Sequence, residues 1–376
     1  MTPRMPNLPH LSKRLEEARK SLCLTQDQVS KQTEGEIGLS SLSEFESGRR
    51  IPTLSQLEIL SQIYRKPLSF FLDEKPDKVI ELIRWRNEPV SSKKEHLEAE
   101  FKQLCRQYYN LEVWTNNKTV GSFKKLFATE PIKSLLQATQ FADDTVKTMG
   151  LGDYPGVVLH KVLEEVYDVK IFYLDLEDDA ISACFYDDEL GPAILINRNK
   201  KRWRRNFDLA HELFHLLIWP MLEKDTNAKD EAEERLANSF AAAFLMPQDK
   251  VIAAIESARD SENRITFDKI DYIARLFDVS IEAFLWRLVS VYNLEKGRVK
   301  ELKSELDAYS ALREDTLADY YPKRYVSLAN EALRNGDIST NRYLEYLKFL
   351  APTRKQAEEI ISANVPEPIE VPLSNP

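Results

Sequence analysis

The feature that most constrains this chain is a five-residue stretch, His211-Glu212-Leu213-Phe214-His215, inside an apolar run from Leu209 to Trp219. Residues four apart share one face of an α-helix, so a helix here would turn both imidazoles toward one point. Two histidines at this spacing can hold a zinc ion, and the glutamate between them can then accept a proton from a water molecule at the open coordination position. The stretch therefore predicts a helix that carries a zinc site, with Glu212 as general base.

A third ligand is expected from the run that begins at Glu231 and ends before Pro247. No proline or glycine interrupts this run, and alanine, leucine and glutamate dominate it, which predicts a second helix. We expect Glu234 as the ligand and Asn238, four residues later on the same apolar face, as the partner that fixes a histidine ring. Glu231 and Glu233 are the competing candidates for the ligand. The alternative for the whole set is a pair of packed core histidines beside a solvated acidic helix start.

The composition sets bounds on size and partners. A chain of 376 residues exceeds the usual size of one domain, and 43% hydrophobic residues can supply a sizeable core. The net charge of −9 argues against a broadly basic nucleic-acid-binding protein, although a local patch can still bind. Three widely spaced cysteines form no paired metal motif and fit a reducing cytoplasm. Since there is neither a signal peptide nor an apolar run of about 18 residues, we expect a cytoplasmic protein without membrane contact.

The first 74 residues predict a compact unit of four or five short helices. Apolar residues recur at helical spacing from Leu11 to Leu22, and capping boxes at Thr25 and Thr53 each mark the start of a helix. Another helix begins near Ser40 and ends before Gly48. Short helices with such turns are typical of a repressor-type helix-turn-helix. Because this unit contains equal numbers of basic and acidic residues, a dimerisation or partner-docking module is the alternative.

The middle of the chain combines helices with a small sheet. The segments 83–86 and 91–109 suggest a long charged helix that packs across a neighbouring domain. A helix at 157–166 precedes three expected strands, at 169–174, 181–186 and 193–197. An exposed strand edge beside the metal helix can pair with an extended substrate, and Ala193–Asn197 is the favoured strand for this role. An ordinary core hairpin is the other interpretation.

Other segments leave their role open. Six basic residues precede the motif helix: Arg198, Lys200, Lys201, Arg202, Arg204 and Arg205. They indicate either a solvated loop or a docking patch at 198–205 for an acidic substrate segment or single-stranded nucleic acid, with Trp203 available for base stacking. Spacing does not single out a donor for the oxyanion among His160, Tyr186 and several arginines. Beyond residue 296 we expect helices at 299–317, 324–334 and 339–350 and an extended proline-rich tail at 362–376.

Two sets of residues resemble known families. The stretches 24–26 (Leu-Thr-Gln) and 45–52 (Phe-Glu-Ser-Gly-Arg-Arg-Ile-Pro) resemble the Xre-like phage-repressor family. Asn197, 207–215, 234–241 and 244–247 (Phe-Leu-Met-Pro) resemble the ImmA/IrrE metallopeptidases. The resemblance implies an α+β fold that is predominantly α. It comprises an N-terminal five-helix helix-turn-helix domain (1–74), a helical linker (75–130), a zincin-like (gluzincin) peptidase domain with a small β-sheet (131–295) and a C-terminal helical region (296–376).

The ImmA/IrrE resemblance also implies a function. Zn²⁺ would be held by His211, His215 and Glu234, and Glu212 would act as general base. The substrate would be a helix-turn-helix repressor encoded nearby, whose cleavage derepresses stress, mobile-element or phage-defence genes. The alternative is a non-proteolytic DNA-binding transcriptional regulator, or an antitoxin-like adaptor, in which the peptidase fold serves as a sensor.

The Xre-like resemblance implies a DNA-binding surface on the first domain. The helix from about Ser40 to Glu46 would enter the major groove and present Ser40, Ser41 and Ser43 to the bases. Gln26 and the pair Arg49 and Arg50 would contact phosphate.

Overall fold

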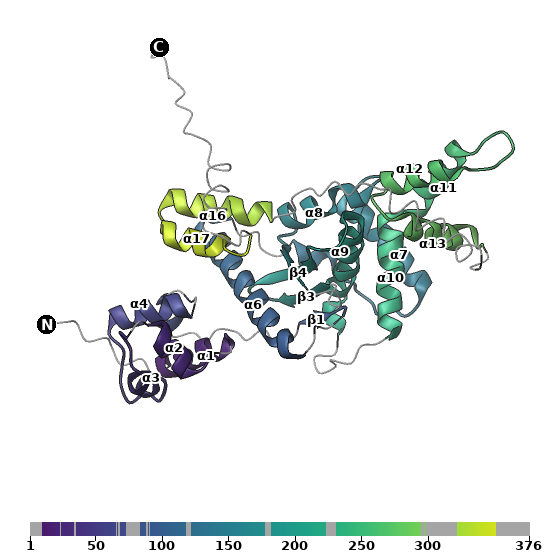
Figure 1. Cartoon of the computed structure of the whole chain (residues 1–376). Coiled ribbons are helices and arrows are strands. Elements are labelled where there is room, and N and C mark those ends of the chain that lie inside the picture. Colours follow the sequence, from purple (N-terminus) through teal and green to yellow (C-terminus); the bar gives the residue numbers. More distant parts are fainter. Residues whose placement is uncertain are drawn as a thin grey trace, which may run out of the picture. The chain divides into compact units, whose positions relative to one another are not determined.

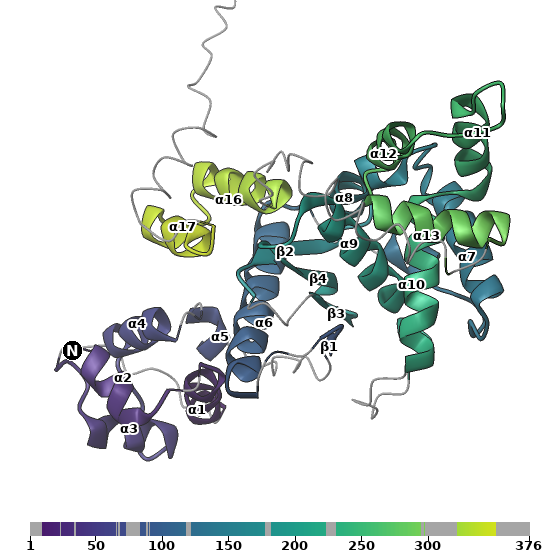
Figure 2. The same ribbon diagram turned by 45° about the vertical axis from the view of Figure 1, so that its right-hand side comes forward.

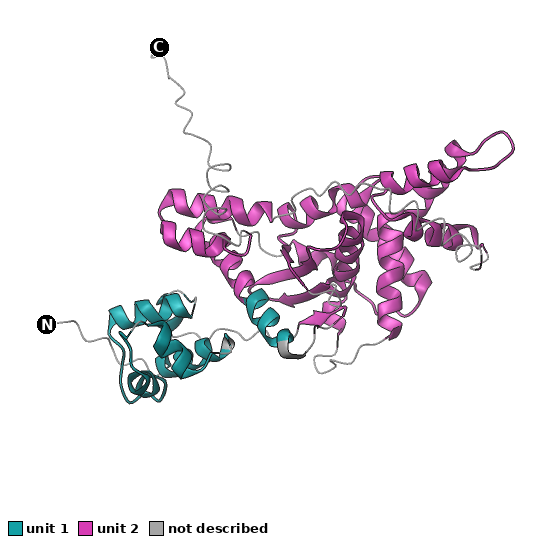
Figure 3. Cartoon of the chain, in the orientation of Figure 1, with its two compact units in different colours: residues 1–81, 90–102 teal, residues 82–89, 103–376 magenta. Residues whose placement is uncertain are grey.

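The chain is predominantly helical and divides into two compact units. A computed structural model describes residues 10–72 except 23, 34, 65 and 67, residues 83–117 except 88 and 90, and residues 122–176, 182–222, 231–294, 297 and 322–350. The first unit comprises residues 1–81 and 90–102, and the second comprises residues 82–89 and 103–376 (Figure 3). No described helix is long and apolar enough to cross a membrane.

The first unit contains the five short helices that the sequence predicts. They are α1 (Leu11–Ser21), α2 (Gln26–Gln32), α3 (Leu39–Glu46), α4 (Leu54–Ile63) and α5 (Leu68–Leu72). Both capping boxes form, with Thr25 capping α2 and Thr53 capping α4. Gly48 follows α3 with a φ of +72°, a conformation that glycine adopts without steric cost. One apolar residue or more from each helix meets in a single core: Leu15, Val29, Leu42, Phe45, Leu57, Leu60 and Phe71.

A four-stranded sheet forms the centre of the second unit. Its strands are β1 (Arg84–Trp85), β2 (Lys170–Leu174), β3 (Ser182–Asp187) and β4 (Gly191–Asn197), in the order β1-β3-β4-β2. β3 and β4 form an antiparallel hairpin, β2 runs parallel to β4, and β1 runs antiparallel to β3. All three predicted strands are therefore present.

The strand order corrects one expectation. Ile194 of β4 pairs with Cys184 of β3 on one side and with Ile171 of β2 on the other, so β4 is an interior strand. The prediction that 193–197 offers a substrate edge is wrong, because both of its backbone edges already carry ladder hydrogen bonds. Among the described strands, β1 and β2 lie at the edges of the sheet.

The segment around Arg84 departs from the predicted helix. The long helix α6 begins only at Ser91 and ends at Trp114, whereas Arg84 and Trp85 form β1. Ile83 and Trp85 are buried while Arg84 and Arg86 are only partly so, which is the alternation of a strand. Pairing with β3, far away in sequence, decides the conformation of this short segment.

Helices cover both faces of the sheet. On one face, α9 (Arg202–Leu217) packs against β3 and β4, and α10 (Glu231–Leu245) packs against α9 and against α7 (Leu135–Met149) (Figures 1 and 2). Together with α8 (Pro155–Glu165), α11 (Gln248–Ala258), α12 (Phe267–Leu276) and α13 (Ile281–Tyr292) they enclose the main core. The shorter helices η1 (Phe123–Leu126) and η2 (Trp219–Met221) pack at its margin.

The opposite face of the sheet is covered by α6 and by α16 (Lys323–Asn335), which is followed by α17 (Thr340–Leu347). Phe172 of β2 makes edge-to-face contacts with Tyr108 of α6 and Tyr325 of α16. α16 and α17 agree with the predicted helices, and Gly336 ends α16 with a φ of +80°. The predicted helix at 299–317 and the tail at 362–376 lie outside the described residues.

A buried ionic cluster joins three of these elements. Lys170 of β2 lies 2.8 Å from Glu112 of α6, and the side chains of both are 2% exposed. Arg324 of α16 also contacts Glu112, at 2.6 Å, and reaches Asp168 at 2.8 Å. The cluster thus connects α6, the sheet edge and the C-terminal helices.

Candidate metal centre

The motif helix α9 is buried along most of its length. His211 and His215 are nearly inaccessible, with side chains 0% and 3% exposed, because α9 lies between the sheet and α10. The two histidines are one helical turn apart, and their Nε2 atoms approach to 3.2 Å. The Nε2 atoms of two imidazoles therefore converge on one point.

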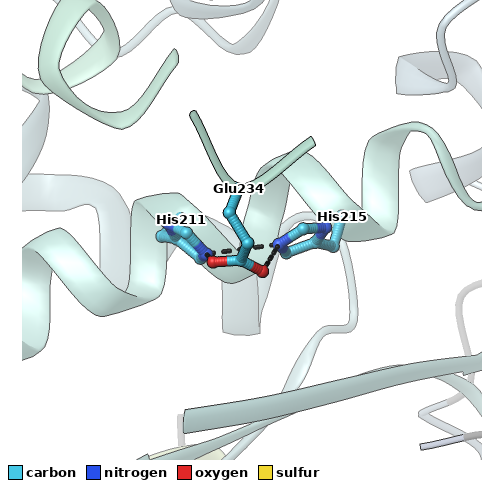
Figure 4. A group of neighbouring side chains, drawn as sticks. All are labelled: His211, His215 and Glu234. Carbon is cyan, nitrogen blue, oxygen red and sulfur yellow. Dashed lines mark hydrogen bonds and ion pairs between the residues drawn. The ribbon is translucent and has the colours of Figure 1, made fainter. Parts of the chain in front are cut away.

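Glu234 of α10 reaches the same point from the neighbouring helix (Figure 4). One carboxylate oxygen lies 3.3 Å from His211 Nε2 and the other lies 3.5 Å from His215 Nε2. Ligand atoms on a tetrahedral zinc ion with bonds of about 2.1 Å lie about 3.4 Å apart, so these separations fit a zinc ion. On a tetrahedral ion, two imidazoles and one carboxylate would occupy three coordination positions and leave the fourth open. His211, His215 and Glu234 could therefore hold a metal.

Each histidine is oriented by a hydrogen bond from its other ring nitrogen. Nδ1 of His211 lies 3.2 Å from Oδ1 of Asn238, and Nδ1 of His215 lies 2.8 Å from Oε1 of Glu233. An acceptor at Nδ1 keeps the proton on that nitrogen and leaves Nε2 free to bind a metal. Asn238 has the place the sequence assigns to it. Glu233, a competing candidate for the ligand, instead faces the far side of the His215 ring.

The candidate Glu231 lies away from this centre. Its side chain is 94% exposed, and its carboxylate is 4.0 Å from Arg235 one turn later on α10. Of the three acids at the start of α10, Glu234 faces the Nε2 atoms, Glu233 faces Nδ1 of His215 and Glu231 faces solvent.

Burial and hydrogen bonding shift the pKa values of the three central residues. Burial lowers the pKa of His211 to about 4, so its imidazole is neutral at pH 7. Burial also acts to lower the pKa of His215, but hydrogen bonds with Glu233 and Glu234 outweigh it and raise that pKa to about 9. Burial acts to raise the pKa of Glu234, whereas its hydrogen bonds with both histidines lower it overall. Glu234 is therefore an ionised carboxylate, the form that binds a cation.

Glu212 lies on the side of α9 that faces the sheet. It is almost fully buried, and its Oε1 accepts a hydrogen bond of 2.6 Å from the hydroxyl of Ser182 on β3. This contact fixes a carboxylate that is adjacent in sequence to a candidate ligand. Ser182 could not be found from the sequence, because the contact depends on how β3 packs against α9.

Arg84 of β1 and Arg86, the residue directly after β1, also reach this centre. Arg84 lies 2.7 Å from Oε1 of Glu233. Arg86 donates to Oδ1 of Asn238 at 3.0 Å and to the buried Asp208. Neither arginine is among the site residues that the sequence predicts. The signal that could have found them is the alternation of apolar and basic residues from 83 to 86.

Two of the candidates for oxyanion stabilisation, His160 and Tyr186, lie in other surroundings. His160 of α8 is 3.8 Å from Glu164 and packs near Tyr173 of β2. Tyr186 of β3 packs against Phe123 and Phe127. Neither set of contacts places the side chain at the metal centre.

The basic cluster 198–205 makes many contacts within the chain. Arg202 lies 2.5 Å from Asp278, and Arg204 lies 3.1 Å from Asp208. Arg205 donates to the backbone oxygen of Arg198, while Lys201 lies over the ring of Trp203. Much of this charge is therefore used in packing the start of α9.

The DNA-contact candidates in the first unit fall into two groups. Ser40, Arg49 and Arg50 are exposed, at the start of α3 and just after its end. Ser41 and Ser43 are partly buried, and Gln26 donates to Glu46 at 2.8 Å, in a contact that also involves Arg19. The exposed residues can contact a DNA duplex directly. Gln26 can do so only if its hydrogen bond to Glu46 breaks.

Comparisons with known families place this geometry in context. Residues 164–289 match the family model of the IrrE N-terminal-like domain of peptidase family M78, and residues 15–71 match a helix-turn-helix model. Residues 164–289 are thus a peptidase domain of the ImmA/IrrE type. This ImmA/IrrE-type protein carries an Xre-type helix-turn-helix domain before its metallopeptidase-type domain, as the sequence motifs indicate. The M78 match includes α9 and α10, but β1 lies outside it.

Other comparisons add little to this ImmA/IrrE assignment. A solved structure of a Mycobacterium tuberculosis transcriptional regulator is 19% identical, with a TM-score of 0.31 over 49% of this chain and 52% of that one. This chain thus spans about half the length of that protein. Curated proteins gave no match.

Proposed function

We propose that the chain is a zinc-dependent endopeptidase that cleaves a helix-turn-helix transcriptional repressor. The observation that carries this proposal is the buried convergence of His211, His215 and Glu234, with Glu212 adjacent on the same helix. A non-catalytic fold has no need for a fixed carboxylate beside three metal-binding side chains. The family match to peptidase M78 supports the same reaction class.

The residues of the chain have distinct tasks in this reaction. His211, His215 and Glu234 would hold the metal, which would supply Lewis acidity for a water molecule and for the peptide carbonyl. Glu212, held by the Ser182 hydroxyl, accepts a proton from the attacking water and delivers it to the leaving amine nitrogen. Asn238 and Glu233 keep the histidine rings turned with Nε2 toward the centre.

The proposed substrate follows from the domain combination. A helix-turn-helix domain can bring the peptidase to DNA where a repressor is bound, or bind a similar domain of the repressor. We propose that the repressor is encoded nearby and that its cleavage relieves repression of stress, mobile-element or defence genes. DNA contact would be made by Ser40, Arg49 and Arg50, which the structure leaves exposed.

The test is to incubate the zinc-loaded chain with the repressor encoded beside it, with and without DNA, and to detect fragments by mass spectrometry. We expect one specific cleavage, and a loss of at least about 10²-fold in rate for Glu212→Gln with zinc retained. Glu231→Gln is the matched control, because that side chain is exposed at the start of α10 and should leave the rate unchanged. Undiminished cleavage by Glu212→Gln would contradict the assigned role.

A second candidate function is a non-proteolytic regulator that senses a ligand through the same fold. The position of β1 favours it, because β1 pairs with Ala183 and Cys184 of the strand that contacts Glu212. That stretch of β3 is then closed to an extended peptide. Retained DNA binding without cleavage by the zinc-loaded chain, in the same assay, would select this function.

A further inference from the structure

Arg84 of β1 and Arg86, which directly follows β1, contact the outer partners of the two candidate histidine ligands. Arg84 lies 2.7 Å from Oε1 of Glu233, and that same oxygen is 2.8 Å from Nδ1 of His215. Arg86 donates to Oδ1 of Asn238 at 3.0 Å, and that same oxygen is 3.2 Å from Nδ1 of His211. One chain of hydrogen bonds thus connects Arg84 to His215, and a second connects Arg86 to His211.

The strand geometry of β1 explains how one short segment serves both histidines. Residues two apart in extended backbone point to the same side, and Arg86 directly after β1 continues the alternation of Arg84, with Trp85 buried between them. Backbone pairing with β3 fixes the position of the strand, and the amide of Arg86 adds a hydrogen bond of 3.0 Å to the carbonyl of Ser182. The hydroxyl of Ser182 in turn holds Glu212.

These arginines do not serve to attract a metal ion. Both side chains are largely buried, Arg84 at 16% and Arg86 at 10% exposure, and a cation near the centre repels a second cation. Asp208 balances the charge of Arg86, and Glu233 balances that of Arg84. What remains for them is to orient hydrogen bonds.

Arg86 determines which end of the Asn238 amide faces His211. The guanidinium can only donate, so it requires an oxygen from Asn238. The oxygen that accepts from Arg86 also accepts the Nδ1 proton of His211, which leaves Nε2 unprotonated. If the amide turned its NH₂ group toward the ring, Nδ1 would become the acceptor and the proton would move to Nε2. The imidazole could then no longer bind a metal through Nε2.

We propose that Arg84 and Arg86 are positioning residues of the metal centre, and that β1 is therefore a structural part of this centre although it lies outside the matched peptidase domain. The inference rests on the proposed function, since it assumes that His211 and His215 bind a metal. The role is to fix the Asn238 amide and the Glu233 carboxylate, and through them the rings of both histidines.

The test measures Co²⁺ affinity of the full chain by competition with a chelator, together with the visible spectrum of the bound ion. We expect Arg86→Gln and Arg84→Gln to weaken Co²⁺ binding by up to about 10- to 100-fold, because loss of the outer partners that they hold, Asn238 and Glu233, would have an effect of that size. If the arginines acted only by charge, their removal would tighten binding. Arg204→Gln is the matched control, because Arg204 contacts the same Asp208 as Arg86, and we expect unchanged affinity.

Asn238→Asp provides a second variant that separates positioning from stability. A carboxylate has only acceptor oxygens, so its orientation toward His211 no longer depends on Arg86. We therefore expect Arg86→Gln to weaken Co²⁺ binding less in the Asn238→Asp background than in the natural chain. An equal or larger loss in that background would overturn the proposal, since a structural role or an ion pair with the new carboxylate predicts that result.

The outcomes separate this inference from the proposed function. If the natural chain binds Co²⁺ and both arginine variants bind it equally well with the same spectrum, β1 has no positioning role and the proposed function stands. If the natural chain binds no Co²⁺, the proposed function itself fails. Tryptophan fluorescence of each variant confirms that the second unit is folded, because all five tryptophans lie in that unit.

Discussion

Glu164 allows a prediction of how stability depends on pH. This residue of α8 is 2% exposed, and its Oε1 has no hydrogen-bond partner among the described residues. Nδ1 of His160 lies 3.8 Å from Oε2 of Glu164. Burial raises the pKa of Glu164 from 4.5 to about 8, because the low-dielectric surroundings disfavour the carboxylate. The folded protein therefore holds a proton here at pH 7 that the unfolded chain has lost.

The sign and size of the effect follow from this pKa. A carboxyl whose folded pKa is raised contributes stability that is present below pH 4.5 and is lost as the pH rises toward 8. Because burial lowers the pKa of His160 from 6.5 to about 4, that residue changes stability only below pH 6.5. Between pH 6.5 and about 8.5, at about 1.4 kcal/mol per pKa unit, Glu164 should cost about 2 kcal/mol of unfolding free energy.

The assay is urea unfolding at both pH values, followed by tryptophan fluorescence, which reports on the second unit alone. Glu164→Gln should remove about 2 kcal/mol of the pH dependence seen in the natural chain. Glu165→Gln is the matched control, since the neighbouring side chain is 56% exposed beside Lys161 and should leave the dependence unchanged. The same pH dependence in Glu164→Gln as in the natural chain would refute the reasoning.

Two further predictions concern the ionic cluster and the first unit. Lys170→Met leaves Glu112 buried with Arg324 as its remaining partner, so we expect a loss of about 3 kcal/mol of unfolding free energy in the same fluorescence assay. An unchanged unfolding midpoint would show that the ion pair between Lys170 and Glu112 does not contribute to stability. Replacing Arg49 and Arg50 together by alanine should weaken binding of a DNA duplex and reduce the salt dependence, with a log–log slope smaller by about 2, in fluorescence anisotropy titrations. An unaltered slope would mean that these exposed arginines do not contact phosphate.

The sequence predicts the centre of the candidate site better than its surroundings. His211 and His215 are related by helical spacing alone, and Glu234 lies on the next helix, so local pattern suffices to bring them together. The partners Arg84 and Arg86 lie far from α9 in sequence, and the strand at this place, Arg84–Trp85, has only two residues. The alternation of apolar and basic residues from 83 to 86 is too short to distinguish a strand from the start of a helix, and only the pairing with β3 decides.

The order of the strands in the sheet could not be predicted from local sequence patterns either. The three strands were found, but the position of β4 between β2 and β3 depends on long-range pairing that the alternation of residues does not encode. Helix faces show a similar limit: Leu159 and Leu163 of α8 are fully buried, whereas Val166, at the same helical spacing just after the end of α8, is 52% exposed. The periodicity gives the direction of a face, and the neighbouring elements decide how much of it is covered.

The zinc content of the purified chain tests the central claim most directly. It is measured by inductively coupled plasma mass spectrometry after gel filtration in metal-free buffer, for the natural chain, Glu212→Gln and His215→Ala. The account predicts one zinc ion per chain in the natural protein and in Glu212→Gln, and little zinc in His215→Ala, because only the last variant removes a ligand. No zinc in the natural chain, or equal zinc in all three proteins, would contradict it.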